Sequence, residues 1–335
     1  MNDMQTKIDL DRDIPHFQET FSKVEDSVRG AMVGLQEVIR LTLTAIFSGG
    51  HVLLEGVPGI GKTMLVKSIS TALGVSFKRI QFTPDLMPSD ITGTQILAED
   101  DSGKRNFVFK KGPVFANLVL ADEINRATPK TQASLLESME ERQITVFDQT
   151  YPLPKPFFVL ATQNPVELEG TYPLPEAQLD RFLLKVLVKP PTSTELKEIL
   201  MRTTGVVPSE VKPVWPGETA SLELQKLQRL VRHVVISTPL QEVIVRMMAA
   251  LTPQSQFATI RVKEYLRFGP GPRGAQALVF AAKVFALLDG RINLSFDDIR
   301  ATILPALRHR LITNFRAEAD GITTDDMIEE VRNAK

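Results

Sequence analysis

The chain has 335 residues, of which 43% are hydrophobic and 24% charged, as in a globular protein with one large or two smaller domains. Its net charge of −1 gives no overall basic field for nucleic acid or membranes, and the absence of cysteine excludes disulfides and thiolate metal sites. Residues 1–13 do not resemble a signal peptide, and the most apolar helix candidate, 275–288, is too short to span a bilayer. We therefore expect a cytoplasmic protein without a membrane span.

The predicted elements begin after a polar segment, residues 1–20. Residues 21–47 have helical periodicity interrupted near Gly30 and Gly34, and from 52 to 188 apolar strands alternate with helices. Several strands are continuous apolar runs, typical of a parallel sheet buried on both faces. The pattern predicts a doubly wound α/β domain over residues 21–191. The expected strands are 52–54, 77–81, 118–121, 157–161 and 183–188.

Two long insertions interrupt this domain. Residues 83–111 are rich in Pro, Gly and Asp, and residues 143–156 predict a β-hairpin with Asp148 and Gln149 near its turn. Connections of this length in a compact domain are often functional.

Residues 192–335 have helical patterning throughout, which predicts a smaller, all-helical second domain. Thr192 with Glu195, and Ser295 with Asp298, form expected capping boxes at two helix starts. The chain therefore divides into a polar start, an α/β domain and a helical domain.

Residues 56–63, Gly-Val-Pro-Gly-Ile-Gly-Lys-Thr, match the phosphate-binding pattern G-x-x-x-x-G-K-[ST] between a strand and a helix. Lys62 would reach the β- and γ-phosphates, and the Thr63 hydroxyl would hold Mg²⁺. The alternative is a glycine-rich turn with a surface lysine. The expected nucleotide-binding residues here are Gly56, Pro58, Gly59, Ile60, Gly61, Lys62, Thr63 and Met64.

A later apolar strand ends in Asp122 and Glu123. Asp122 would lie beside the metal, usually through a water, and Glu123 would orient the water that attacks the γ-phosphate. The alternative is an acidic helix cap. Asn164 follows the next strand, whose carboxyl end lies beside that of the Asp122 strand in a parallel sheet, so its amide could bond the γ-phosphate or the water. Asparagine is also common in loops, particularly before a proline such as Pro165.

Two arginines complete the candidate site. Arg181 precedes the fifth strand and is either a structural arginine paired to a carboxylate or an arginine finger directed at a neighbouring subunit's γ-phosphate. Arg273 opens an apolar helix, where its charge opposes the helix dipole, which indicates a phosphate or a carboxylate partner.

Taken together, these residues resemble an AAA+ ATPase of the MoxR group, related to the magnesium-chelatase ATPase subunit. The resemblance runs from about residue 33 past residue 311. Its most specific parts are Glu-Ile-Asn-Arg-Ala at 123–127 and Tyr-Pro-Leu-Pro-Glu-Ala at 172–177. The segments that carry it are 56–63, 120–127, 161–165, 170–182, 269–275 and 307–311.

The resemblance implies the Walker A role for Lys62 and Thr63, the Walker B role for Asp122 and Glu123, and sensor 1 for Asn164. The two insertions resemble the family's helix-2 insert and the hairpin before sensor 1, and the helical domain resembles its lid.

The same resemblance implies that Arg181 acts on the adjacent subunit's ATP, whereas Arg273, as sensor 2, reaches the ATP of its own subunit. Arg126 falls where a residue faces the subunit interface, and Gln36 lies in the segment beside the adenine. One departure is Phe-Asp-Gln at 147–149, where the family pattern has Asp-Gly in the hairpin turn.

The implied activity is Mg²⁺-dependent ATP hydrolysis by a ring of about six subunits. The implied role is chaperone-like, with a partner that carries a von Willebrand factor A domain. A DNA-acting AAA+ motor is disfavoured by the near-neutral charge and 7% aromatic content. A GTPase or small-molecule kinase lacks support because no Asn-Lys pair occurs. A scaffold that binds ATP without turnover is disfavoured by Glu123, Asn164 and Arg181.

Overall fold

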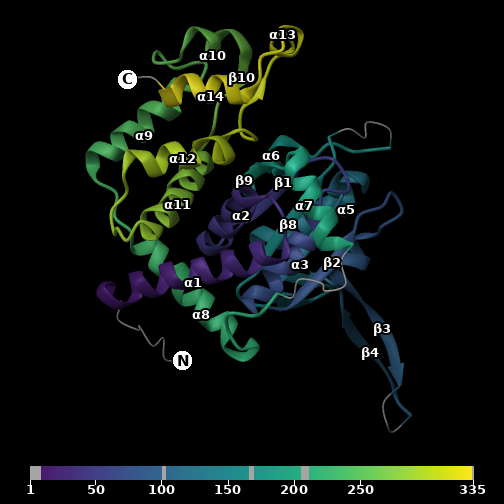
Figure 1. The fold of residues 1–335 in the computed structure, drawn as a ribbon. Helices are drawn as coiled ribbons and strands as arrows, with labels where there is room; N and C mark the ends of the chain where they lie inside the picture. Colours follow the sequence, from purple (N-terminus) through teal and green to yellow (C-terminus); the bar gives the residue numbers. More distant parts are fainter. Residues whose placement is uncertain (1–8, 100–102, 166–169, 205–210, 334–335) are drawn as a thin grey trace.

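The computed structural model describes residues 9–99, 103–165, 170–204 and 211–333, and the structural statements below refer to these. A five-stranded parallel sheet with the order β2-β5-β8-β1-β9 forms the centre of the first domain (Figure 1). All five predicted sheet strands are confirmed. They are β1 (His51–Glu55), β2 (Phe77–Gln81), β5 (Leu118–Asp122), β8 (Phe158–Gln163) and β9 (Phe182–Leu187).

The sheet is buried on both faces, which explains the unbroken apolar runs in its strands. Side chains alternate between the faces. Val52 and Leu54 join a core that includes residues of the first three helices, whereas Leu53 joins a second core on the opposite face with residues of α4 and α5. The helices of this domain are α1 (Leu10–Ala31), α2 (Gln36–Ser48), α3 (Lys62–Leu73), α4 (Pro88–Thr92), α5 (Pro129–Glu141) and α6 (Glu176–Leu179), with a 3-10 turn η1 (Ile124–Arg126).

The first helix begins earlier than the sequence suggested. α1 starts at Leu10, inside the segment 1–20 that was expected to be a polar start; residues 1–8 lie outside the described residues. Phe17 is fully buried, and its ring meets that of Phe47 edge-on at 5.4 Å between centroids. The apolar face of α1, rather than its average polarity, decides that it belongs to the fold.

Both insertions contain antiparallel hairpins. β3 (Gly93–Glu99) and β4 (Arg105–Lys111) extend away from the body of the molecule (Figure 1). β6 (Gln143–Val146) and β7 (Gln149–Pro152) form the second hairpin, as predicted. Its turn is Phe147-Asp148, one residue earlier than expected, and Phe147 has a φ of 52°, in the left-handed region that Asp-Gly turns satisfy without strain.

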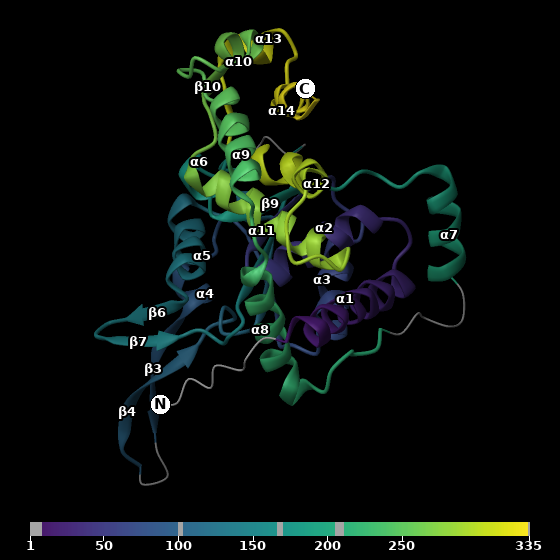
Figure 2. The ribbon, with the colours of Figure 1, turned by 90° about the vertical axis from the view of Figure 1, so that its left-hand side faces the viewer.

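The second domain lies to one side of the sheet domain, whereas α7 (Ser193–Thr203) stands apart from it on the side of α1 (Figure 2), where Arg202 donates to the carbonyl oxygen of Gly30 at 3.2 Å. Both predicted capping boxes, at Thr192 and Ser295, are present. The domain is helical except for a short antiparallel pair, β10 (Leu266–Phe268) and β11 (Ile312–Thr313). Its helices are α7 (Ser193–Thr203), α8 (Gly217–His233), α9 (Thr238–Ala250), α10 (Ile260–Tyr265), α11 (Pro272–Leu288), α12 (Phe296–Leu307), α13 (Phe315–Ala319) and α14 (Thr324–Asn333). Within the described residues, no helix combines the length and apolarity needed to cross a bilayer.

Candidate active site

The phosphate-binding loop has the predicted setting, between the carboxyl end of β1 and the start of α3. Gly59 and Gly61 have φ values of 82° and 84°, which glycine adopts without strain. A side chain at Gly56 is excluded because its Cβ would lie 2.6 Å from the carbonyl oxygen of Val188. The loop therefore turns tightly into the N-terminus of α3, where free N–H groups and the helix dipole favour an anion.

Lys62 is the first residue of α3 and is only 8% exposed. Its ammonium group donates a hydrogen bond to the carbonyl oxygen of Gly56, at the start of the loop. Burial lowers the pKa of the Lys62 ammonium group below its ordinary value, while Asp122 and Glu123 partly oppose this shift. The cation is thus held inside the loop, beside the Walker B carboxylates.

Asp122, at the end of β5, is buried and accepts hydrogen bonds on both carboxylate oxygens. Thr162 donates to one oxygen at 2.7 Å, and Thr63 donates to the other at 3.3 Å. Arg79, from β2, donates to that second oxygen through Nε at 3.0 Å and Nη2 at 2.7 Å. The Arg79 guanidinium therefore neutralises the carboxylate that was predicted to serve the metal.

The residues present fit Mg²⁺. Thr63 and Asp122 supply a hydroxyl and a carboxylate oxygen next to the loop, and Mg²⁺ in such sites takes few protein ligands besides phosphates and water. No group of three or more His, Asp or Glu side chains that could hold a metal ion occurs among the described residues.

Glu123 is held on three sides. Its backbone N–H donates to the Thr162 hydroxyl at 2.8 Å, and its carboxylate contacts Gln81 at 3.0 Å and Arg126 at 3.2 Å. Its φ of 57° lies in the left-handed region, which costs a non-glycine residue roughly 1–3 kcal/mol. In this structure Arg126 is thus engaged with the carboxylate of its own chain.

Asn164 and the segment before Gln36 border the same loop. Asn164 is 4% exposed and directly follows β8, whose last residue, Gln163, accepts a 3.2 Å hydrogen bond from the N–H of Gly56. Gln36 begins α2, and Met32, four residues earlier, lies 3.3 Å from the position of a Cβ on Gly61. Asn164 therefore lies at the loop's end of the sheet, and Gln36 follows a segment whose Met32 packs against the loop.

The two arginines lie at the opposite end of the sheet, where its parallel strands begin. Arg181 precedes Phe182, which pairs with His51, the first residue of β1, whereas the phosphate-binding loop follows the last residue of that strand. Opposite ends of a five-residue strand are roughly 13 Å apart. Arg181 therefore lies far from the phosphate-binding loop of its own chain.

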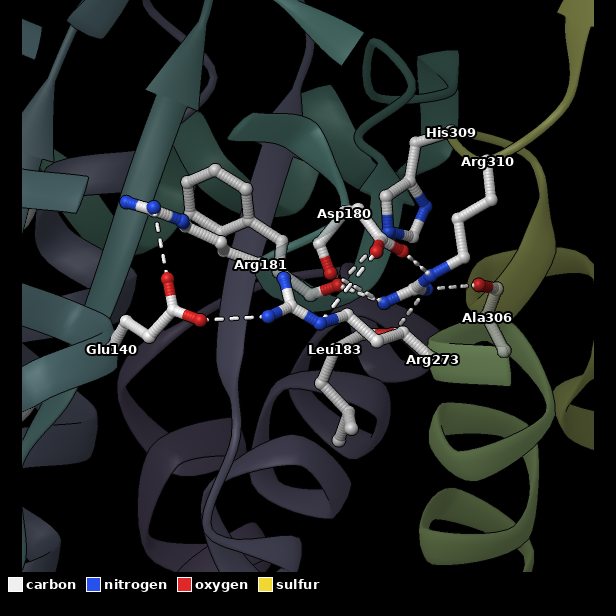
Figure 3. A network of polar contacts seen from close by, with 9 residues as sticks. Glu140, Asp180, Arg181, Leu183, Arg273, Ala306, His309 and Arg310 are labelled. Atoms are coloured by element: carbon white, nitrogen blue, oxygen red, sulfur yellow. Dashed lines mark hydrogen bonds and ion pairs between the residues drawn. The ribbon is translucent and has the colours of Figure 1, made fainter. Parts of the chain in front are cut away.

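Arg273, in the first turn of α11, was expected to reach its own chain's ATP, but the structure places it beside Arg181. Both arginines bind the carboxylate of Glu140, Arg181 at 2.8 Å and Arg273 at 2.7 Å (Figure 3). Glu140 lies in the last turn of α5, which runs from the carboxyl ends of the sheet strands back to their amino ends. A cavity of about 260 Å³, lined also by Arg142 and Arg310, opens between them, and its guanidinium groups suit a phosphate.

Several residues of this site carry no clear signal in the sequence. Thr162 lies within the segment 161–165 that was singled out, and Gln81 stands opposite Asp122 in the parallel register, so the strand order would have revealed it. Arg79 lies two residues before Gln81 in the same strand. Glu140 carries no local signal, because its partners are distant in sequence.

Comparison with known proteins places this geometry among ATPases. Residues 51–184 match the profile of the ATPase family associated with various cellular activities (AAA), and residues 258–331 match the AAA lid domain. Chaperone MoxR1 of Mycobacterium tuberculosis is 41% identical over 93% of this chain and 81% of its own. Uncharacterized protein YeaC of Bacillus subtilis is 42% identical over 93% of both chains.

The fold itself has a solved counterpart. The crystal structure of a candidate ATPase from Cytophaga hutchinsonii is 38% identical, covers 97% of each chain and superposes with a TM-score of 0.88. The two-domain architecture described above is thus shared with a protein solved by crystallography.

Proposed function

Because the chain belongs to the MoxR family of AAA+ ATPases, we propose that it hydrolyses ATP in a site completed by two protomers of a ring. The family supports ATP hydrolysis itself. The observation that supports a shared site is the separation of its parts. Lys62 and Glu123 lie at the carboxyl ends of the sheet strands, and Arg181 and Arg273 lie together at the amino ends. In a head-to-tail ring, Arg181 and Arg273 of one protomer would approach the phosphate-binding loop of the next protomer.

Within one protomer, the loop N–H groups and Lys62 bind the β- and γ-phosphates. Glu123 accepts a proton from the attacking water, and Asn164 orients that water. Thr63 and Asp122 would hold Mg²⁺, which would neutralise charge on the phosphate oxygens. Gln81 and Arg126 must release the Glu123 carboxylate before it can act as a base.

From the adjacent protomer, Arg181 contacts the γ-phosphoryl group, and Arg273 joins it rather than serving its own chain's nucleotide. Arginine fingers contribute ~10³–10⁵ in rate, so an isolated protomer should be almost inactive. The lid carries Arg273, so a movement of the lid changes the neighbour's site. A ring of about six subunits fits this arrangement.

The cellular role proposed here is chaperone-like remodelling of a partner protein. It is supported by the relative named Chaperone MoxR1 and by the exposed β3–β4 hairpin, in which Phe107 is 72% exposed. A protein with a von Willebrand factor A domain is the partner class that the family resemblance implies.

The test combines two measurements. Glu123→Gln should bind ATP with unchanged affinity but release phosphate at least about 100-fold more slowly. The specific activity of the unmodified protein should rise with protein concentration. Normal turnover by the Glu123 variant would remove that residue from the mechanism, and a flat concentration dependence down to the monomer would refute the shared site.

A further inference from the structure

Arg310 carries its charge into an almost closed environment. It lies in the turn after α12, and only 3% of its side chain is exposed. A buried guanidinium is costly unless all its N–H groups find acceptors. Asp180 provides the compensating charge, with its carboxylate 2.7 Å from Nε of Arg310.

The remaining donors of Arg310 all bind backbone carbonyls. Nη2 donates to the carbonyl oxygens of Asp180 at 3.1 Å and Phe182 at 2.7 Å, and Nη1 donates to Leu183 at 3.1 Å and also to Ala306 (Figure 3). Asp180 and Phe182 are the residues on either side of Arg181. The Arg310 guanidinium therefore forms hydrogen bonds to the backbone directly before and after Arg181, the proposed arginine finger.

His309, the residue before Arg310, adds a further hydrogen bond to the same backbone segment. His309 is buried, and its Nε2 lies 2.9 Å from the carbonyl oxygen of Phe182, which already accepts from Arg310. Burial and the adjacent Arg310 charge keep the pKa of His309 well below its ordinary value, so the ring is neutral and Nε2 donates. Two consecutive lid residues thus converge on one carbonyl beside Arg181.

We propose that Arg310 is a positioning residue for Arg181, and that it transmits the position of the lid to the arginine presented to the neighbouring protomer. This inference rests on the proposed action of Arg181 on the adjacent ATP. Arg310 itself does not touch the nucleotide. Arg310 fixes the backbone that carries Arg181, and it belongs to the same domain as Arg273. A movement of the lid would therefore shift Arg181 and Arg273 together.

The expected defect is in catalysis rather than in nucleotide binding. A misplacement of about 1 Å in a catalytic group can cost about 100-fold in rate. Arg310→Lys keeps the charge but cannot reach several acceptors at once, so we expect kcat to fall ~10- to 100-fold. ATP affinity should be unchanged, because the phosphate-binding loop lies at the carboxyl ends of the sheet strands, whereas Arg310 lies at their amino ends.

Mixed rings separate this role from a defect in the protomer's own site. Glu123→Gln lacks hydrolysis in its own site but keeps its arginines, whereas Arg181→Ala has the reverse defect. In a one-to-one mixture, about a quarter of head-to-tail interfaces join an intact site to an intact arginine, so activity returns. Arg310→Lys should recover activity with Glu123→Gln and should not recover it with Arg181→Ala.

Arg308→Lys is the matched control. Arg308 lies in the same turn, but it pairs with Asp325 of the lid at 2.9 Å, and we expect activity close to that of the unmodified protein. Unchanged kcat in Arg310→Lys, or recovery when it is mixed with Arg181→Ala, would overturn the proposal. Failure of the Glu123→Gln and Arg181→Ala mixture would instead refute the shared site itself.

A second variant covers the case in which Arg310→Lys does not fold, as judged by its thermal unfolding. Asp180→Asn removes the carboxylate partner of Arg310 and leaves the carbonyl contacts in place. It should show the same mixing pattern with a smaller loss, ~3- to 10-fold. Full activity of Asp180→Asn would then overturn the proposal.

Discussion

Glu140 holds the two arginines in the absence of a neighbour, so its charge should oppose ring activation. Its carboxylate binds Arg181 and Arg273, and it lies in the last turn of α5, where a negative charge is also unfavourable for the helix dipole. In the proposed ring, the γ-phosphate of the adjacent protomer would have to replace Glu140 as the partner of both arginines. Glu140→Gln removes the charge with little change in shape and should release both arginines more readily.

The size of this effect follows from the exposure of the cluster. The side chains of Arg181, Glu140 and Arg273 are 27%, 39% and 50% exposed, so solvent screens both ion pairs. Each such pair contributes about 0.2–1 kcal/mol. Loss of both amounts to roughly 0.4–2 kcal/mol, or a 2- to 30-fold change in an equilibrium constant.

The assay is phosphate release as a function of protein concentration at saturating ATP. The concentration at half-maximal activity should fall by ~2- to 30-fold in Glu140→Gln, with kcat unchanged. Glu141→Gln is the matched control, since it makes the same change one residue later on the same helix end. A half-activation concentration that stays the same or rises would refute the reasoning, and a lower kcat would mean that Glu140 positions the arginines productively.

Three further predictions concern the metal site, acid stability and the first helix. Arg79→Ala should lower the Mg²⁺ concentration for half-maximal hydrolysis by ~2- to 5-fold, because Arg79 competes for the Asp122 carboxylate and is 47% exposed. Burial, together with the nearby Arg142 charge, lowers the pKa of His51 to about 4 from 6.5, so the unfolded chain binds a proton first as pH falls. The free energy of unfolding should therefore drop by about 2 kcal/mol between pH 7.5 and 5, measured by urea unfolding. Phe17→Ala should lower the free energy of unfolding by about 3–5 kcal/mol, because it empties a fully buried site.

Each of these has its own control. Lys78→Ala changes the exposed neighbour of Arg79 and should leave the Mg²⁺ requirement unchanged. His51→Gln should reduce the loss of stability in acid, and an undiminished loss would assign it to other groups. Phe107→Ala, at a 72% exposed site, should change stability by less than about 0.5 kcal/mol, and an equal effect of both phenylalanine variants would contradict the burial of α1.

Much of the nucleotide site could be predicted because its signals are local. The loop at 56–63 declares itself by glycine spacing, and Asp122 and Glu123 by their place after an apolar strand. The five strands were predictable for the same reason, since burial on both faces imposes continuous apolar runs. The start of α1 was harder, because its polar average conceals one apolar face.

The positions of Arg181 and Arg273 could not be predicted from local sequence. The sequence alone indicated that Arg181 and Arg273 were candidates for phosphate contact, since both occur in specific motifs. The tertiary structure alone decided where each one lies, and it placed Arg273 beside Arg181 on the carboxylate of Glu140.

The sequence by itself determined the chemistry of this protein, because the phosphate loop and the Walker B strand are each encoded within a few consecutive residues. Only the tertiary structure decided which side chains share a carboxylate or a carbonyl. Arg310 meets Asp180 across 130 positions of sequence, and Arg273 meets Glu140 across 133. Such pairings depend on how two domains pack, and the packing of distant segments leaves no periodic trace in either segment.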